Sequence, residues 1–99
     1  MKNNLSKQTF VVTGATSGIG LAVTEALAAQ GATILGVGRS KTACRAAEQH
    51  LFSLHPHAQV HYLRADLSIQ DEVRHLSDQI ASWLQQHNIP ALNGLLNNA

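Results

Sequence analysis

This 99-residue sequence is poor in cysteine, proline and aromatic residues, and it carries almost no net charge. Its one cysteine, Cys44, excludes an internal disulfide, suits a reducing compartment and is interpreted as structural. Seven basic and six acidic residues argue against general binding to nucleic acid or to a membrane surface. No apolar run has membrane-spanning length, and the polar residues 1–8 do not have the pattern of a secretory signal. We therefore expect a cytoplasmic protein in which residues 1–99 form a single domain.

Strand-like and helix-like patterns alternate along the whole chain, without an internal repeat or a long linker. The predicted strands are residues 9–13, 33–37, 60–63 and 92–97. The predicted helices begin near Ile19, after a Ser40 cap, and after Ser68, whose spacing to Asp71 resembles a capping box. The apolar stripes expected to face a sheet are Ile19, Val23 and Leu27; Ala43, Ala47, Leu51 and Leu54; and Ile69, Val73, Leu76, Ile80 and Trp83.

Strands that are joined by helices run parallel, and right-handed crossovers then predict the strand order 3-2-1-4. The predicted fold is therefore α/β, a partial doubly wound parallel sheet of the Rossmann-like kind. The last strand, residues 92–97, is apolar enough for the middle of a sheet. Ligands of such folds bind where the strand order reverses, at the carboxyl edge of the sheet.

A glycine-rich loop follows the first predicted strand, at residues 13–20, Thr-Gly-Ala-Thr-Ser-Gly-Ile-Gly. Gly14 permits a sharp exit from the strand, Gly18 lets backbone N–H groups approach a pyrophosphate, and Gly20 allows close packing of helix and strand. Thr16 and Ser17 complete the loop. This pattern predicts a phosphate cradle for a dinucleotide, although glycine-rich segments also form ordinary turns.

Four motifs occur in order, each at the end of a predicted strand: Thr13-Gly14-x-x-x-Gly18-x-Gly20, Gly38-Arg39-Ser40, Asp66-Leu67 and Asn97-Asn98-Ala99. With these motifs the chain resembles the N-terminal cofactor-binding part of short-chain dehydrogenases/reductases. The resemblance covers almost every residue, and the three-residue gap between the first two glycines is itself typical of that family. It implies a Rossmann fold and a nicotinamide cofactor.

The resemblance implies NADP(H) as that cofactor. Family members that use NAD typically carry an acidic residue at the position of Gly38, where it binds the ribose 2′-hydroxyl. Here Gly38 leaves room, Arg39 offers a fork of donors suited to a phosphate, and Ser40 adds a hydroxyl. The alternative is that Arg39 and Lys41 are ordinary solvated residues at a helix start, where positive charge opposes the helix dipole.

The remaining motif residues have roles that follow from the resemblance alone. Asp66 would accept a hydrogen bond from the adenine amino group and Leu67 would contact the ring edge; alternatively, Asp66 caps the turn before the next helix. Asn97 would steady the central strand, and the backbone around Ala99 would border the cofactor ribose. Ile19 would border the nicotinamide, or would be an ordinary core residue.

No catalytic residue is assigned. The family uses a tyrosine with a lysine four residues later, but Tyr62, the only tyrosine, is followed at that spacing by Asp66, whose charge would raise the pKa of a neighbouring phenol. No serine inherits a catalytic role. No metal site is assigned either, because the histidines at positions 50, 55, 57 and 61 lack a regular ligand spacing.

Three hypotheses follow. The leading one is an NADP(H)-dependent short-chain oxidoreductase, represented here by its cofactor-binding part and inactive alone. The second is a non-catalytic NADP(H)-binding or subunit-interaction module that self-associates through an exposed fourth strand bearing Leu92, Leu95 and Leu96. The third is a decayed remnant that binds nothing. The sequence does not indicate the substrate.

Overall fold

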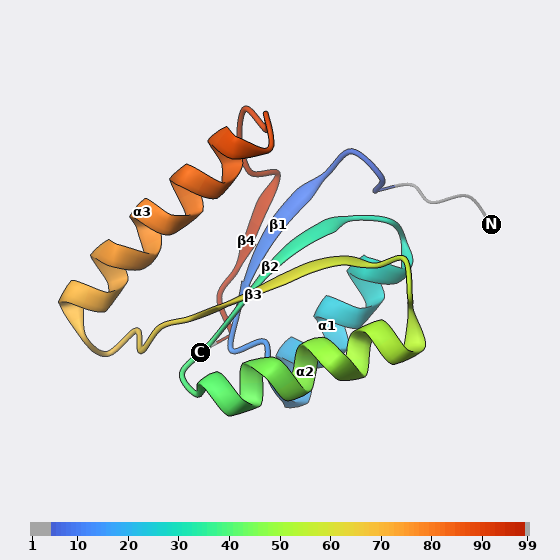
Figure 1. The fold of residues 1–99 in the computed structure, drawn as a ribbon, viewed down its shortest axis with the longest axis horizontal. Helices are drawn as coiled ribbons and strands as arrows, with labels where there is room; N and C mark the ends of the chain where they lie inside the picture. The colour runs from blue at the N-terminus through green and yellow to red at the C-terminus, as the bar shows by residue number, and fades with distance from the viewer. Residues whose placement is uncertain (1–4, 99) are drawn as a thin grey trace.

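A computed structural model describes residues 5–98 of the chain (Figure 1). Its strands form one parallel sheet in the order β3-β2-β1-β4, as the sequence predicted. The elements in chain order are β1 (Thr9–Thr13), α1 (Gly18–Ala29), β2 (Thr33–Gly38), α2 (Lys41–Leu54), β3 (Gln59–Arg64), α3 (Gln70–Gln86) and β4 (Gly94–Leu96). The α/β, Rossmann-like fold class is therefore confirmed.

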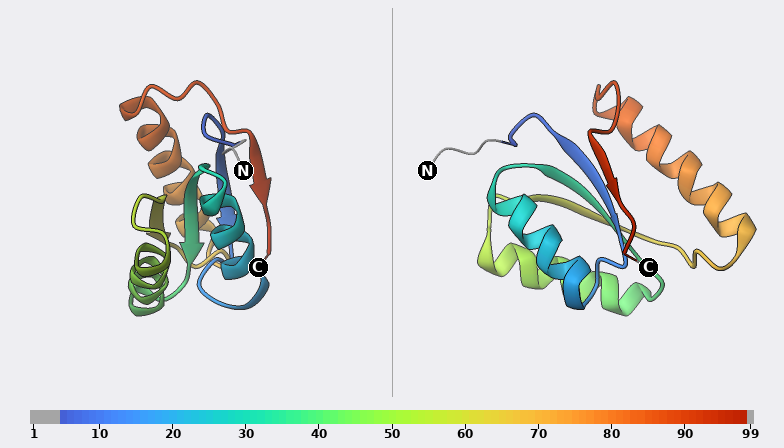
Figure 2. Two further views of the ribbon diagram at one scale, coloured as in Figure 1. Left: turned by 90° about the vertical axis from the view of Figure 1, so that its right-hand side faces the viewer. Right: turned by 180° about the vertical axis from the view of Figure 1, so that it is seen from behind.

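The sheet is covered on both faces, by α1 and α2 on one side and by α3 on the other (Figures 1 and 2). Side chains alternate between faces along each strand, so Val12 packs toward α1 and α2 while its neighbour Val11 packs toward α3. Ile34 and Leu35 divide in the same way on β2. These continuous apolar runs are typical of parallel strands buried on both faces.

The buried face of α1 differs from the prediction. The stripe expected to face the sheet began at Ile19, but that side chain is 72% exposed, and the buried residues are Gly20, Thr24 and Ala28. Small side chains on this face let the helix approach the sheet closely, and the Thr24 hydroxyl donates to the Gly20 carbonyl at 2.8 Å, which satisfies its buried polar group. The prediction was therefore only partly right: Leu27 packs against the core and Val23 is half-buried, but the fully buried positions are held by small residues.

The other two stripes are only partly correct. On α2 the buried residues are Cys44, Ala47 and Leu51, whereas Leu54 is exposed. On α3 only Leu76 is fully buried, with Ile80 and Trp83 packed beside it, and Ile69 and Val73 are exposed. In both helices the sheet covers the middle of the predicted stripe and leaves one end uncovered.

The predicted capping box at the start of α3 does not form. Ile69 precedes the first helical residue, and no side chain caps the helix there. Ser68 instead donates to Asp66, through its backbone N–H at 3.0 Å and its hydroxyl at 2.6 Å. The Asp66 carboxylate thus closes the turn before the helix, because a short acidic side chain readily accepts from the backbone two residues on.

The fourth strand is shorter than predicted and lies at the edge of the sheet in the described part of the chain. Its residues Leu95 and Leu96 are 65% and 39% exposed, which agrees with their predicted exposure. Leu92 is not exposed as expected: it precedes the strand and is half-buried against the α3 side of the core. The loop from α3 brings Leu92 over the sheet before β4 begins.

Candidate cofactor-binding site

A cleft of about 560 Å³ lies at the carboxyl edge of the sheet. It is lined by Gly14, Thr16, Ser17, Gly18, Ile19, Val37, Gly38, Arg39, Ala65, Asp66, Leu67, Ser68 and Asn98. These residues lie at or just after the ends of β1, β2, β3 and β4, so every strand contributes to one site. The chain crosses from β3, at one edge of the sheet, to β4 beside β1, and the cleft lies at this reversal of strand order. Its size is that of a small-molecule pocket.

The backbone of the glycine loop requires glycine at three positions. Gly14 and Gly18 have φ angles of +59° and +56°, in the left-handed region that side chains with a Cβ disfavour. Gly20 is required for a different reason, because a Cβ atom there would overlap the carbonyl oxygen of Gly14. The loop is therefore folded tightly against the start of α1, with open space over Gly18.

The amino end of α1 opens on this cleft without a cap. The first intrahelical bond comes from Leu21 N–H to the Ser17 carbonyl at 3.2 Å, so the amides before it have no acceptor in the helix. The Ser17 side chain makes no capping bond, and the first turn contains no acidic residue. Of the three described helices, only α1 has neither device. Such an end attracts anions through its free N–H groups and its dipole.

Arg39 and Ser40 follow β2 at the same edge. Arg39 lines the cleft and is exposed, and within residues 5–98 its guanidinium forms no ion pair with an acidic group. Ser40 does not line the cleft; its hydroxyl accepts from Ala43 N–H at 3.2 Å and caps α2. The preceding residue, Gly38, is buried where a Cβ atom would overlap the Thr16 methyl group.

Asp66 and Leu67 follow β3 and also line the cleft. The Asp66 Oδ1 atom accepts both hydrogen bonds from Ser68, and these bonds, with smaller contributions from Arg39 and Arg64, hold the pKa of this carboxyl below its usual value. The turn-capping role is therefore real. This role uses only the Oδ1 atom. A hydrogen bond from the adenine amino group to the Oδ2 atom therefore stays a prediction.

The asparagines after β4 have different positions. Asn97 Oδ1 accepts from the Thr13 hydroxyl at 2.8 Å, which ties the ends of β4 and β1 together, and Asn97 does not line the main cleft. Asn98 does line it, and its N–H donates to the same hydroxyl at 2.9 Å. Ala99 lies outside the described residues.

Sequence reasoning missed several cleft residues, namely Val37, Ala65, Ser68 and Asn98. Each is adjacent to a predicted site residue or motif. The signal that could have found them was position, since residues next to a strand end share its edge of the sheet whatever their type. Gly20, by contrast, does not line the cleft and shapes its loop through the close approach to Gly14.

Tyr62 and Cys44 are structural. The Tyr62 hydroxyl donates to the Ala15 carbonyl at 2.6 Å, and burial, with a smaller effect of Cys44, raises the pKa of this phenol well above its usual value. The predicted influence of Asp66 is not the cause. Burial likewise raises the pKa of the Cys44 thiol, whose sulfur lies 3.8 Å from the Leu63 carbonyl oxygen. Neither side chain lines the cleft.

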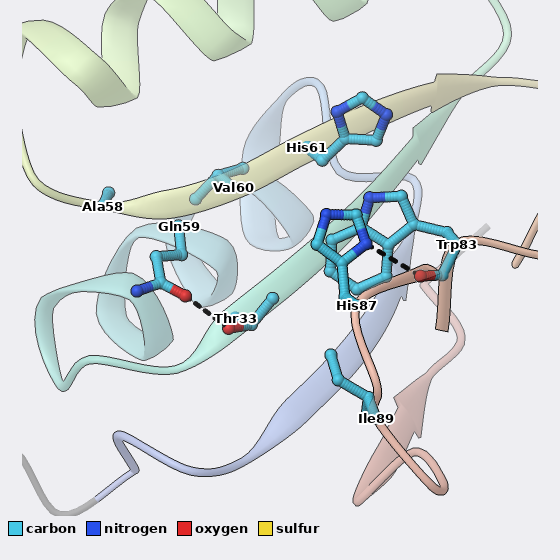
Figure 3. Close-up of a pocket in the computed structure, with 8 residues that line it drawn as sticks. All are labelled: Thr33, Ala58, Gln59, Val60, His61, Trp83, His87 and Ile89. Atoms are coloured by element: carbon cyan, nitrogen blue, oxygen red, sulfur yellow. Dashed lines mark hydrogen bonds between the residues drawn. The ribbon is translucent and has the colours of Figure 1, made fainter. Parts of the chain in front are cut away.

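A second cleft, of about 430 Å³, lies at the opposite end of the strands (Figure 3). There the Trp83 ring stacks on His87, with ring centroids 4.1 Å apart, and lies nearly parallel to the ring of His61, whose centroid is 6.3 Å away. Outside this cleft, the His55 Nε2 atom lies 3.6 Å from a carboxylate oxygen of Glu25. Within residues 5–98, no three histidine, cysteine or acidic side chains are grouped to hold a metal ion. The same residues include no helix that could span a membrane.

Comparison with known proteins identifies the family. The short chain dehydrogenase family profile matches residues 8–99, and the chain therefore belongs to that family. Short-chain dehydrogenase TIC 32 A, chloroplastic, from Brassica napus is 34% identical over 91 residues, which are 92% of this chain and 27% of that protein.

Two solved structures extend the similarity to the fold. An NADPH-bound short chain oxidoreductase from Pseudomonas aeruginosa PAO1, described as containing an atypical catalytic center, is 36% identical, with a TM-score of 0.71 over 76% of this chain and 29% of that one. A metagenomic short-chain oxidoreductase in complex with NADP is 30% identical, with a TM-score of 0.79 over 96% of this chain and 40% of that one. The chain thus spans less than half the length of each of these proteins.

Proposed function

We propose that this chain is the NADP(H)-binding part of a short-chain oxidoreductase, that residues 1–99 form one partial Rossmann unit, and that it is inactive alone. The observation that carries the proposal is the uncapped amino end of α1, which opens on a cleft of cofactor size beside a left-handed glycine loop. Free amides at a helix start are a site for phosphate. No other end of a described helix combines these features.

The choice of NADP(H) is supported by the second strand end. The Arg39 guanidinium has no acidic ion-pair partner among residues 5–98, so its donors can serve a phosphate. An acidic residue at position 38, which would favour NAD, would overlap Thr16. The Ser40 oxygen accepts the capping bond of α2, which leaves its own O–H able to donate to the phosphate. NADPH and NADP in the two compared structures point the same way.

The other site residues would complete the cofactor contacts. Asp66 and Leu67 would hold the adenine, and the exposed Ile19 side chain would border the nicotinamide half. Asn97 would act indirectly by holding β4 against β1. When bound, the nicotinamide would supply a hydride to a carbonyl carbon or accept one from an alcohol carbon. The proton transfer that accompanies this step needs a residue that this chain does not provide, because Tyr62 is bound to Ala15 away from the cleft.

Calorimetric titration of the 99-residue chain with NADPH and with NADH tests the proposal. We expect NADPH to bind more tightly than NADH. Arg39→Gln should lower the affinity for NADPH by about tenfold and leave the affinity for NADH unchanged. Arg45→Gln is the matched control, because Arg45 is exposed on α2 and does not line the cleft. Binding of neither cofactor, or preference for NADH, would contradict the proposal. NADPH-dependent carbonyl reduction by this chain would contradict its inactivity.

A second candidate function is a non-catalytic module that binds NADP(H) and self-associates through β4. The observation that favours it is the exposure of Leu95 and Leu96 on the edge strand. An apolar edge strand presents unpaired backbone groups that can pair with another chain. Sedimentation at increasing concentration tests this idea: a monomer throughout would refute it, and a dimer that Leu95→Lys disrupts would support it.

The cytoplasmic location stays a prediction. The free, buried Cys44 is compatible with a reducing environment such as the cytosol, and no disulfide is available to require an oxidising one.

A further inference from the structure

Two loops that line the cleft are connected by one side chain, Arg64, the last residue of β3. Its Nε–H donates to the Arg39 carbonyl at 2.9 Å, and its Nη1 donates to Glu72 Oε1 at 2.8 Å. The same Glu72 oxygen accepts the Asp66 backbone N–H at 2.7 Å. A continuous chain of hydrogen bonds therefore runs from the Arg39 backbone to the Asp66 backbone.

The hydrogen bonds of the sheet end at Gly38 and Ala65, which line the cleft. Arg64 pairs with Gly38 at the last register position of β2 and β3, and a final backbone bond joins Ala65 N–H to the Gly38 carbonyl at 2.9 Å. Beyond this point the bridge from Arg64 to Glu72 takes over from the sheet. This bridge fixes the position of the Arg39 backbone relative to that of Asp66.

We infer that Arg64 and Glu72 are positioning residues that hold the two adenosine-side loops of the cleft in place before a cofactor binds. The inference rests on the proposed function. Loops fixed in advance cost less ordering entropy when the ligand binds. The two arginines at this edge thus have separate roles, since the charge of Arg64 is offset by Glu72 whereas Arg39 has no such partner among residues 5–98.

The alternative is that Arg64 is a second phosphate ligand, and the cofactors distinguish the two roles. A positioning residue affects adenosine binding as a whole. Arg64→Gln should therefore lower the affinities for NADPH and NADH by a similar factor, about three- to tenfold for a partly exposed bridge. A phosphate ligand would weaken NADPH alone, and that result would overturn the inference. Arg74→Gln is the matched control, because Arg74 is exposed on α3 and does not line the cleft.

Glu72 gives an independent test. Under the positioning role, Glu72→Gln also weakens both cofactors, and the double variant is no worse than the more affected single one because both break the same bridge. If Glu72 only neutralised Arg64, the variant would free a cation and NADPH would bind more tightly, which would overturn the inference. The control is Asp71→Asn, since Asp71 is the other acidic residue in the first turn of α3 and takes no part in the bridge.

Hydrogen exchange of the Asp66 amide tests the bridge without any cofactor. Glu72→Gln exchanges the charged carboxylate acceptor for a weaker neutral amide oxygen, and Arg64→Gln removes the guanidinium that anchors it. Both should therefore speed exchange at the Asp66 amide by at least about threefold, and Asp71→Asn should not. Unchanged exchange would show that the bridge is absent. If the variants change the exchange rate but the parent chain binds neither NADPH nor NADH, the bridge exists and the proposed function is refuted. The positioning role then falls with the proposed function. Changed exchange with unaltered affinity for both would refute the positioning role alone.

Discussion

The helices α1 and α2 both begin at the carboxyl edge of the sheet, but they begin in opposite ways. At α2, the Ser40 hydroxyl accepts the Ala43 N–H, so the chain satisfies its own helix end. At α1, Ser17 occupies the equivalent position and makes no such bond, while the glycines around it open the backbone to the cleft. Serine stands before each helix, yet only one of the two is a cap. The difference teaches that a serine before a helix is not by itself a cap, and that the uncapped end is the one left with free N–H groups for an anion.

The largest expected effect comes from filling the space that keeps the open end in place. Gly20→Ala would put a methyl group against the Gly14 carbonyl oxygen, so we expect a loss of about 3 kcal/mol in the free energy of unfolding, together with loss of cofactor binding. Urea unfolding followed through the fluorescence of Trp83, the only tryptophan, measures this change.

Ala26→Ser is the control for Gly20→Ala, because Ala26 is an exposed residue of the same helix. A Gly20→Ala variant as stable as this control would show that α1 does not need to approach the glycine loop so closely.

The next prediction separates the effect of backbone conformation from that of steric overlap. Gly18 has open space where a Cβ would lie but a φ of +56°, so Gly18→Ala should cost about 1–2 kcal/mol through strain alone. Urea unfolding gives the stability, and titration with NADPH gives the accompanying change in affinity. A fully stable variant would show that the loop does not require the left-handed conformation.

The two serines provide a direct test of the comparison. Ser40→Ala removes a capping bond and should cost about 1 kcal/mol in the free energy of unfolding. Ser17→Ala removes no capping bond and should stay within about 0.5 kcal/mol of the parent. Parallel urea titrations decide the matter, and equal losses would mean that α1 is capped after all.

The smallest effect concerns the turn that closes the cleft on the β3 side. Because hydrogen bonds from Ser68 lower the pKa of Asp66 from 3.8, they stabilise the fold above that pH, and this contribution is lost as the pH falls through the lower pKa of the folded state. Ser68→Ala removes the hydroxyl donor and should raise the pKa of Asp66 toward 3.8.

Titration of the Asp66 carboxyl carbon by NMR across the acid range measures this shift. Ser77→Ala, at an exposed position of α3, serves as its control. An identical pKa in the Ser68→Ala variant would show that the backbone N–H of Ser68 alone holds the carboxylate.

Much of the fold was predictable because local patterns point directly to it. Apolar runs separated by helical patterns require parallel strands, and the strand order 3-2-1-4 then follows from crossover handedness. Eight predicted site residues, including Gly14, Arg39 and Asp66, line one cleft because each follows a strand, and parallel strands end at a common edge. The roles of these residues in cofactor binding stay predictions.

The rest depended on particular side-chain and backbone contacts that the apolar periodicity does not reveal. Large apolar side chains misled the assignment of the buried face of α1, since the close approach at Gly20 selects the small face instead. Asp66, rather than a Ser68 cap, closes the turn before α3 because its carboxylate and the Ser68 donors are two residues apart.

The sequence by itself determined the order of strands and helices and the edge at which the glycines, Arg39 and Asp66 meet, because periodicity and chirality act locally along the chain. Only the tertiary structure decided which helix end stays uncapped and which arginine is held by Glu72. Those outcomes depend on how side chains compete for partners in three dimensions, and Arg64 meets both Arg39 and Glu72 only after the sheet has brought their loops together.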